Sequence, residues 1–394
     1  MPSPANPHPV TASHKSPAPS SSARRCWARI DLGALAHNAR AVAAHIGPRA
    51  GILAVVKADA YGHGLAETAR TLAPHVRMFG VANLAEAREL RAAVPGARVL
   101  LLSPALPDER EPVAAEGFEP AISGFAEAAA YSAVTPADHT LRVHLSIDTG
   151  MGRMGVAEPE AVEVFRSIRA LPRLRVEAVA THLPCADEDE PFTRSQLARF
   201  GEILRALRAV DPELPLSHSL NSAGLLAFPD HAPDLVRAGL VLYGVSPLSG
   251  FQSRLRPALS MHTRVALVRE LAPGSGISYG RTFLTRRPTR AATLCAGYAD
   301  GYPRHLSGSG ASVLVKGTRC PLLGRVTMDQ IVVDVTDLPE PVEPGEEAVL
   351  LGSQGEAAVT AAELAERAGT IPWEIFTGMQ CRDGRVHVGE EFAA

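Results

Sequence analysis

The sequence predicts an α/β fold, with an N-terminal (β/α)8 TIM-like barrel followed by a mostly β C-terminal domain. From Trp27 to residue 260, short apolar runs alternate with longer stretches of helical periodicity, as in parallel sheets covered by helices. Beyond residue 260, β-branched runs alternate with Gly and Pro turns, and helical periodicity is confined to TAAELAERAG. A chain of 394 residues exceeds what one domain usually holds, which supports this division.

The predicted boundaries follow from local composition. Residues 1–25 are rich in Pro, Ser and Ala and lack the continuous apolar stretch of a secretory signal, so they are predicted to form a disordered tail. Residues 26–260 are predicted to form the barrel, and residues 261–394 are predicted to form the β domain.

Eight short apolar runs are candidate strands, and their number favours a closed barrel, because a (β/α)8 barrel has eight strands and usually spans about 250 residues. These runs are residues 52–56, 78–82, 98–102, 119–123, 142–147, 176–180, 216–220 and 240–244. Between them, segments such as NLAEARELRAAV and SQLARFGEILRALRAV repeat apolar residues at three- and four-residue steps, which predicts helices. An open doubly wound sheet is the alternative, but no G-x-G-x-x-G follows the first run.

The composition points to small-molecule chemistry. The formal net charge of -3 gives no electrostatic reason to expect a nucleic-acid or membrane partner, and no apolar run is long enough to span a bilayer. Five cysteines without a C-x-x-C pair argue against a disulfide scaffold and for a reducing compartment, so a cytoplasmic location is predicted. The H-x-x-C of His182 and Cys185 lacks a second ligand pair, so no metal is predicted.

Polar residues follow the predicted strands at their C-terminal ends, where barrel enzymes place their chemistry. Chance would scatter such residues over both rims, so together they predict one convergent site. They comprise Lys57 and Tyr61 after the first strand, DTGMGRMG (148–155) after the fifth, THLPCADE (181–188) after the sixth, NSAG (221–224) after the seventh and Tyr243 at the end of the eighth.

Lys57 gives this site its predicted chemistry. A lysine amine in a partly desolvated site has a lowered pKa and can form a Schiff base with an aldehyde, of which pyridoxal 5′-phosphate (PLP) is the commonest. PLP needs a phosphate cradle, and Asn221 and Ser222 offer a hydroxyl and backbone N–H donors at a predicted helix start. Taken singly, N-S is also an ordinary helix cap, and Lys57 is an ordinary surface amine.

Ordered segments from residue 28 onward extend this interpretation. They are ARIDLGALAHNARAV (28–42), AVVKADAYGHG, DTGMGRMG, THLPCADE, NSAG, LVRAGLVLYG, ISYGRTF, AGYADGYPR, GRVTMDQ and the final CRDGRVHV. With these segments the sequence closely resembles the alanine racemase family of barrel-type PLP enzymes, over nearly the whole chain after the tail. The K-A-D-A-Y-G-H-G and G-Y-A-D-G segments are the most specific.

The resemblance implies a PLP-dependent racemase that interconverts L- and D-alanine by a two-base mechanism and supplies D-alanine for peptidoglycan. Lys57 resembles the lysine that bonds to PLP and moves a proton on one face of Cα. Tyr298, in GYADG, resembles the base that serves the opposite face and comes from the second subunit. A homodimer with shared active sites is therefore implied, in which the β domain contributes to the partner's site.

Other positions match the family's binding residues. Arg237 resembles the arginine that faces the pyridine nitrogen, which it should leave unprotonated because an arginine stays charged. His182 resembles the histidine that contacts this arginine and the tyrosine base. Arg153 resembles the arginine at the cofactor's phenolic oxygen and the substrate carboxylate, and Met328, with Asp329, matches a substrate-side loop that reaches the partner's site. The phosphate-end positions match Tyr61, Asn221, Ser222, Gly239 and Leu240.

Three positions depart from the commonest family pattern. Ser146 stands seven residues before Arg153, where many members carry a carbamylated lysine that props this arginine. We expect a bound anion such as chloride, or a water network, to fill the space. Thr327 replaces a frequent cysteine, and Cys381 falls near a position where some members supply a tyrosine to the phosphate.

These departures leave alternatives open. A racemase of broader or different specificity, for serine or a larger amino acid, would keep the fold and the cofactor. Decarboxylation ranks lower, because the relatives that decarboxylate are not expected to carry the Tyr298 segment in this form. A non-catalytic PLP-binding protein is a further alternative, although it has no evident need for the β domain or for Tyr298.

Overall fold

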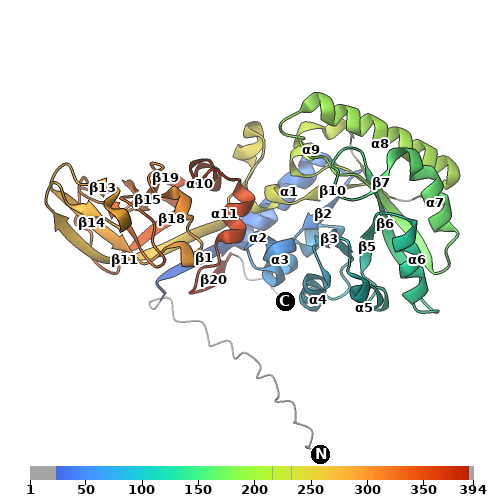
Figure 1. Cartoon of the computed structure of the whole chain (residues 1–394), viewed down its shortest axis with the longest axis horizontal. Helices are drawn as coiled ribbons and strands as arrows, with labels where there is room; N and C mark the ends of the chain where they lie inside the picture. The colour runs from blue at the N-terminus through green and yellow to red at the C-terminus, as the bar shows by residue number, and fades with distance from the viewer. Residues whose placement is uncertain (1–23, 215, 232, 390–394) are drawn as a thin grey trace, which may run out of the picture.

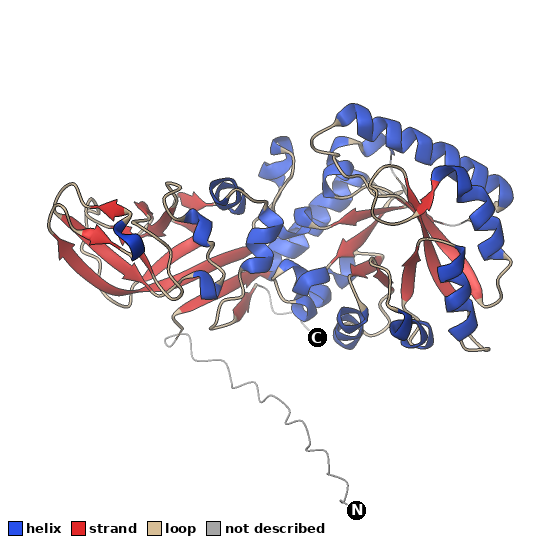
Figure 2. Ribbon diagram, viewed as in Figure 1, coloured by secondary structure: helices blue, strands red, loops and turns tan. Residues whose placement is uncertain are grey.

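The computed structural model describes residues 24–214, 216–231 and 233–389. The predicted tail therefore lies outside the described residues except for Arg24 and Arg25. Figures 1 and 2 show a helix-covered barrel beside an elongated domain built mainly of strands. This arrangement confirms the predicted fold class.

The barrel is a parallel sheet of eight main strands in the order β10-β2-β3-β4-β5-β6-β8-β9. The two ends of this order approach each other, since the backbone N–H of Arg237 donates to the carbonyl of Leu220 over 2.8 Å. The strands are β2 (Gly51–Val55), β3 (Met78–Val81), β4 (Val99–Leu101), β5 (Glu119–Ile122), β6 (Leu141–Asp148), β8 (Leu174–Ala180), β9 (Leu216–His218) and β10 (Leu235–Ala238), with the short β7 (Val156–Ala157) beside β6.

Helices cover the outside of this barrel (Figure 2). Several begin at a side chain that accepts a backbone N–H, as Asp31 does for α1 and Asn83 for α4, which satisfies an otherwise unpaired donor. The helices are α1 (Leu32–Ile46), α3 (Leu65–Leu72), α4 (Leu84–Ala93), α5 (Arg110–Ala115), α6 (Phe125–Val134), α7 (Ala161–Arg169), α8 (Glu190–Val210) and α9 (Ser222–Ala227).

The predicted eighth strand, residues 240–244, is wrong. The strand at this position is β10, and it is followed by a buried 3-10 turn, η6 (Leu240–Tyr243). Both segments are apolar and buried, so periodicity cannot distinguish them. Because β10 ends at Ala238, Arg237 lies on the strand itself rather than on a loop before it.

The first described strand is not among the predicted strands, and its residues lie within the range predicted for the barrel. β1 (Cys26–Asp31) pairs with β11 (Leu259–Leu271) and β20 (Arg385–Val388), which belong to the second domain's sheet. The chain therefore passes through the β domain before it enters the barrel at α1.

The second domain is a nine-stranded sheet with the main order β16-β15-β18-β11-β1-β20. Strand β14 pairs with β11 and β17, and strand β19 pairs with β18. Its remaining strands are β14 (Thr289–Leu294), β15 (Ser312–Val315), β16 (Thr318–Pro321), β17 (Ile331–Asp334), β18 (Glu347–Gln354) and β19 (Ala357–Val359), and a separate hairpin joins β12 (Gly276–Ile277) to β13 (Phe283–Leu284).

Two helices complete this domain, α10 (Ala361–Ala368) and α11 (Pro372–Gly378). Helix α11 lies where the domains meet (Figure 1). A Cβ at Gly62, which has a φ of +78°, would lie 2.4 Å from the carbonyl oxygen of Phe376 in α11, so only glycine fits there. Across the described residues, no helix combines the length and apolar composition needed to cross a bilayer.

Candidate active site

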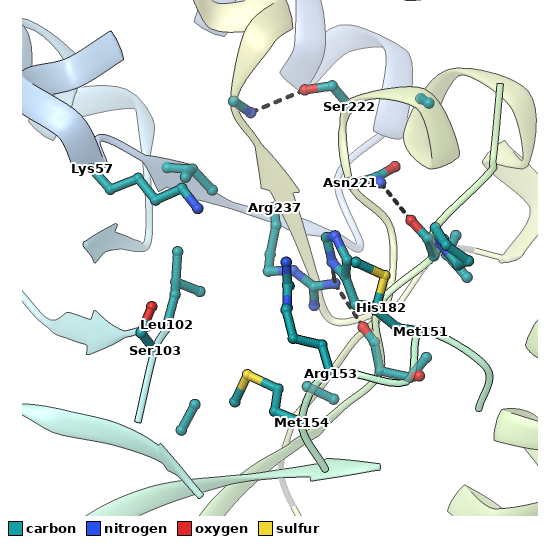
Figure 3. A pocket seen from close by; sticks show the side chains of 18 of the residues that line it. Lys57, Leu102, Ser103, Met151, Arg153, Met154, His182, Asn221, Ser222 and Arg237 are labelled. Atoms are coloured by element: carbon teal, nitrogen blue, oxygen red, sulfur yellow. Dashed lines mark hydrogen bonds between the residues drawn. The ribbon is translucent and has the colours of Figure 1, made fainter. Parts of the chain in front are cut away.

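A cavity of about 880 Å³ opens at the C-terminal ends of the barrel strands. This volume is typical of sites for small molecules. The structure brings together in its wall every predicted cofactor-binding residue, as well as Ser146. These residues are Lys57, Tyr61, Arg153, His182, Asn221, Ser222, Arg237, Gly239 and Leu240. Figure 3 labels Lys57, Arg153, His182, Asn221, Ser222 and Arg237 among them.

Lys57 begins a short left-handed turn, α2 (Lys57–Tyr61), directly after β2. The four residues Ala58 to Tyr61 all have φ between 52° and 54°, a conformation that costs about 1–2 kcal/mol per residue. Contacts outside the turn hold it: Glu86 accepts the N–H of Ala58 over 2.8 Å, and Arg385 from β20 pairs with Asp59 over 2.6 Å. The turn is thus fixed by the barrel and the β domain together.

The amine of Lys57 points into the cavity (Figure 3). Burial is the main cause that lowers the pKa of Lys57, and the positive charge of Arg153 lowers it further, while Glu86 partly opposes this shift. A larger fraction of the amine is therefore neutral at a given pH, which suits attack on an aldehyde.

Arg237 lies on β10 with 7% of its surface exposed. Its two terminal nitrogens are bonded to protein: Nη1 to Nδ1 of His218 over 2.6 Å, and Nη2 to the carbonyl of Thr181 over 2.6 Å. The third nitrogen of the guanidinium group, Nε, has no hydrogen-bond partner among the described residues and is accessible from the cavity. Burial lowers the pKa of Arg237 to about 10, so the group stays protonated at neutral pH and offers one free donor.

His182 lies beside this arginine, as the sequence predicts. Nη2 of Arg237 lies 3.1 Å from Nδ1 of His182 and, because arginine has only donors, His182 accepts through Nδ1 and carries its proton on Nε2. Burial first, and then the positive charges of Arg237, Arg153 and Lys57, lower the pKa of His182 to about 3. His182 is therefore a neutral imidazole.

The residues predicted to bind the phosphate lie in the cavity wall, and several of them approach one another closely. Ser222 accepts the N–H of Gly239 over 3.1 Å. A Cβ on Gly239 would lie 2.8 Å from the hydroxyl of Tyr61, so glycine is required for this close approach. Asn221 uses its amide within the protein, accepting from Gly224 N and donating to the carbonyl of Leu183.

Two residues of the site were missed from the sequence. His218, on β9, lies 2.6 Å from Nη1 of Arg237, closer than His182, and its place on a predicted strand is the one sequence signal that could have found it. Trp373 of α11 lines the cavity and bonds through its side chain to Tyr61, whose pKa burial raises to about 12. No local signal distinguishes Trp373 from an ordinary core aromatic residue.

Arg153 projects into the cavity from the loop after β6 (Figure 3). Asp148 shapes this loop by accepting the backbone N–H groups of Gly150, Met151 and Gly152 over 2.9–3.1 Å. Within the described residues, Arg153 makes no hydrogen bond or ion pair, and Ser146 lines the same cavity. The expected anion or water network beside Arg153 stays a prediction.

Tyr298 and Met328 do not line this cavity. They lie on neighbouring loops of the β domain with 42% and 52% of their surfaces exposed. The N–H of Tyr298 donates to the carbonyl of Thr327 over 3.0 Å, and that of Ala299 donates to the carbonyl of Met328 over 3.0 Å. The two side chains therefore belong to one rigid unit that faces outward.

Arg382 ties this unit to the body of the domain. It donates to both carboxylate oxygens of the buried Asp300, over 2.7 and 2.9 Å, and to Asp329 over 2.6 Å. The neighbouring Cys381 is buried and lies outside the cavity wall. Its position thus supplies no side chain to this cavity, whereas Trp373 lines it.

The donor set fits PLP. A lysine with a lowered pKa, one free guanidinium donor, and the closely packed Ser222, Gly239 and Tyr61 lie in the wall of one cavity. A (β/α)8 barrel with this cavity at the C-terminal ends of its strands defines a PLP-dependent enzyme of the barrel type.

The chain belongs to the alanine racemase family. The family model for the alanine racemase N-terminal domain matches residues 30–247, and that for the C-terminal domain matches residues 258–387. The alanine racemase of Symbiobacterium thermophilum is 41% identical over 372 residues, covering 93% of this chain and 98% of that protein. The alanine racemase of Halothermothrix orenii is 39% identical over 364 residues, covering 91% and 96%.

Solved structures agree with these relatives. The crystal structure of alanine racemase from the D-cycloserine-producing Streptomyces lavendulae matches with a TM-score of 0.85 at 36% identity, covering 93% of this chain and 98% of that chain. That of the biosynthetic alanine racemase from Pseudomonas aeruginosa matches with a TM-score of 0.84 at 34% identity, covering 93% and 100%. The resemblance of the sequence to this PLP-dependent family is confirmed.

Proposed function

We propose that the protein is a PLP-dependent alanine racemase, an isomerase that interconverts L- and D-alanine and supplies D-alanine for peptidoglycan. One observation carries the proposal: the amine of Lys57 and the Nε–H of Arg237, unpartnered among the described residues, share one cavity. PLP, when bound to the amino nitrogen of alanine, withdraws electrons from Cα and makes its C–H bond acidic. The names of the relatives support alanine as the substrate.

In this proposal the residues of the chain divide the work. Lys57 removes or returns the Cα proton on one face, and Tyr298 from a second copy of the chain does so on the other. Arg153 binds the substrate carboxylate, and Arg237 donates to the ring nitrogen and leaves it unprotonated. Tyr61, Asn221, Ser222, Gly239 and Leu240 hold the phosphate.

Two bases of different chemistry are required because the reaction inverts a centre. A proton removed from one face of Cα must be replaced from the other face, and no single side chain reaches both. The neutral His182 supports this division, because its Nε2–H is free to donate to a tyrosine oxygen presented at the mouth of the cavity.

A homodimer with shared active sites is part of the proposal. Its support is the exposure of Tyr298 and Met328 on a rigid unit, together with the exposed Tyr279 and Leu284 of the same domain. Exposed apolar side chains that gather in one domain are typical of a surface that a partner covers. We also propose a cytoplasmic location, because all five cysteines are free.

The experiment that tests the function uses purified protein with PLP and L-alanine in D2O. We expect loss of optical rotation together with deuterium incorporation at Cα. Exchange without racemisation would contradict the two-base reaction, and PLP absorbance with neither signal would favour a non-catalytic PLP-binding protein. The same assay across serine and larger amino acids tests the alternative specificities that Ser146 leaves open.

A further inference from the structure

A chain of hydrogen bonds runs from Arg237 through the interior of the barrel, away from the cavity. Nη1 of Arg237 lies 2.6 Å from Nδ1 of His218, and Nε2 of His218 lies 2.8 Å from Nδ1 of His144. Nε2 of His144 in turn lies 3.0 Å from a carboxylate oxygen of Glu119. The two histidines and Glu119 lie on β9, β6 and β5, and all are almost fully buried.

Only one placement of protons satisfies this chain. Arginine has donors and no acceptor, so Nδ1 of His218 must accept and its proton must sit on Nε2. Nδ1 of His144 must then accept from His218, and Nε2 of His144 must carry the proton that it donates to Glu119. Every bond therefore points from Arg237 toward Glu119, and both imidazoles are neutral.

Glu119 is held as an anion at the far end. Its side chain is 2% exposed, and Arg98 donates to both of its oxygens over 2.8 and 2.7 Å, while Arg142 donates to one over 3.2 Å. Burial alone would raise the pKa of Glu119, but hydrogen bonds from His144 and Arg98 lower it to about 2. A fixed carboxylate can only accept, so Glu119 imposes from its end the same bond direction that Arg237, which can only donate, imposes from the other.

We propose that Glu119 is a positioning residue for the cofactor ring, acting on Arg237 through His144 and His218. This inference rests on the proposed PLP site. With Nδ1 of His218 locked as an acceptor, Arg237 keeps its Nη1 turned into the barrel and leaves Nε–H for the ring nitrogen. No carboxylate pairs directly with Arg237 among the described residues, so this chain is its link to a negative charge.

The variant Glu119→Gln tests the direction of the chain. Nε of Arg98 and Nε of Arg142 face one oxygen of Glu119, while Nη2 of Arg98 and Nε2 of His144 face the other. When the oxygen of the introduced amide takes the first position and keeps two arginine donors, its NH2 group faces Nε2 of His144 together with Nη2 of Arg98. His144 must then accept through Nε2 and donate from Nδ1, which forces the proton of His218 onto Nδ1, against Nη1 of Arg237. A single neutral substitution thus reverses both tautomers and removes one bond of Arg237.

We expect three effects in the holoenzyme. Nitrogen-15 spectra of histidine-labelled protein should show both tautomers reversed, and the absorbance band of bound PLP should shift. Racemisation of alanine should fall about 10- to 100-fold, as is usual when an outer partner of a binding group is lost. Abortive transamination should rise relative to racemisation, because a displaced Arg237 no longer keeps the ring nitrogen unprotonated.

Glu177→Gln is the matched control, since Glu177 also contacts Arg98, over 2.9 Å, but does not contact His144. It should leave the tautomers, the PLP band and the transamination ratio unchanged. If the Glu119→Gln variant kept the histidine tautomers and the PLP absorbance band of the wild type, the proposal would be overturned. If that variant does not fold, spectra of the wild-type holoenzyme decide, because a proton on Nδ1 of His218 would also overturn it. These spectra need PLP but no turnover, so they separate this inference from failure of the racemase function.

Discussion

The two proposed bases are built in opposite surroundings. Lys57 lies in a cavity of the barrel, on a turn held by Glu86 and Arg385. Tyr298 lies on an outward-facing unit of the β domain, with 42% of its surface exposed, yet its loop is also tightly bonded. One chain therefore holds each of the two proposed bases in a fixed position but does not bring them together. In the proposed dimer, a second copy of the chain would place its Tyr298 near Lys57.

The largest expected effect follows from removing Lys57, the proposed base in the barrel. Lys57→Ala should abolish measurable racemisation, with a loss of more than about 10⁴-fold, because the covalent link to PLP and one base disappear together. Mass spectrometry after borohydride reduction should show no PLP attached. Lys316→Ala is the control, since Lys316 pairs with Glu346 in the β domain. Activity near wild type in the Lys57 variant would contradict its role.

Removing the second base should leave the barrel half intact. Tyr298→Phe should lower racemisation by about 10²- to 10⁴-fold, the usual contribution of a general acid or base, while PLP binds as before. Tyr302→Phe, on the same loop, removes a hydroxyl that is buried without a partner among the described residues, and it should keep full activity.

Mixing the two inactive chains tests whether the halves meet between subunits. A heterodimer of a Lys57→Ala chain and a Tyr298→Phe chain contains one cavity with both bases intact. We expect activity to return on mixing, to about half of the wild-type activity per heterodimer if the two sites work independently. Mixed dimers without activity would rule out shared sites.

A smaller effect should follow from loosening the outward-facing unit. Arg382→Gln removes the charged partner of the buried Asp300, which should lower the free energy of unfolding by about 1–3 kcal/mol. Racemisation should fall while PLP affinity stays constant, because Arg382 does not line the cavity. Chemical denaturation and PLP titration measure both, with the exposed Arg304→Gln as control. A matching loss of PLP affinity would show that the two halves are coupled within one chain.

The smallest expected effect is a shift in pH dependence. The charge of Arg153 lowers the pKa of Lys57, so Arg153→Gln should raise that pKa. The neutral amine then appears at higher pH, and the pH profile for PLP uptake by the apoenzyme should move upward. Arg175→Gln, on the surface of β8 away from the cavity, should not move it. A profile that moves downward would contradict the assigned charge interaction.

The sequence was most informative where function depends on short, continuous motifs. Lys57, Tyr61 and Ser222 could be assigned to one rim because parallel strands bring their C-terminal ends together. His218 and Trp373 could not, because each acts through a contact with a residue distant in the sequence. The exposure of Tyr298 is likewise a property of tertiary structure, invisible in the GYADG motif itself.

The same reason explains the strand that was predicted wrongly and the strand that was not predicted. An apolar, buried 3-10 turn at residues 240–243 follows β10 so closely that local pattern could not separate them. Strand β1 was not predicted, because the local pattern carries no information about its neighbours. Its partners β11 and β20 lie hundreds of positions further along.

The pairing of β1 also constrains the order in which the chain folds. Strand β1 is synthesised before the barrel strands, yet the N–H of Cys26 donates to a carboxylate oxygen of Asp383, 357 positions later, over 2.9 Å. The whole barrel is synthesised before either neighbour of β1 has been made. The central sheet of the β domain can therefore close only after the barrel has been synthesised, when β1 finds its partners β11 and β20.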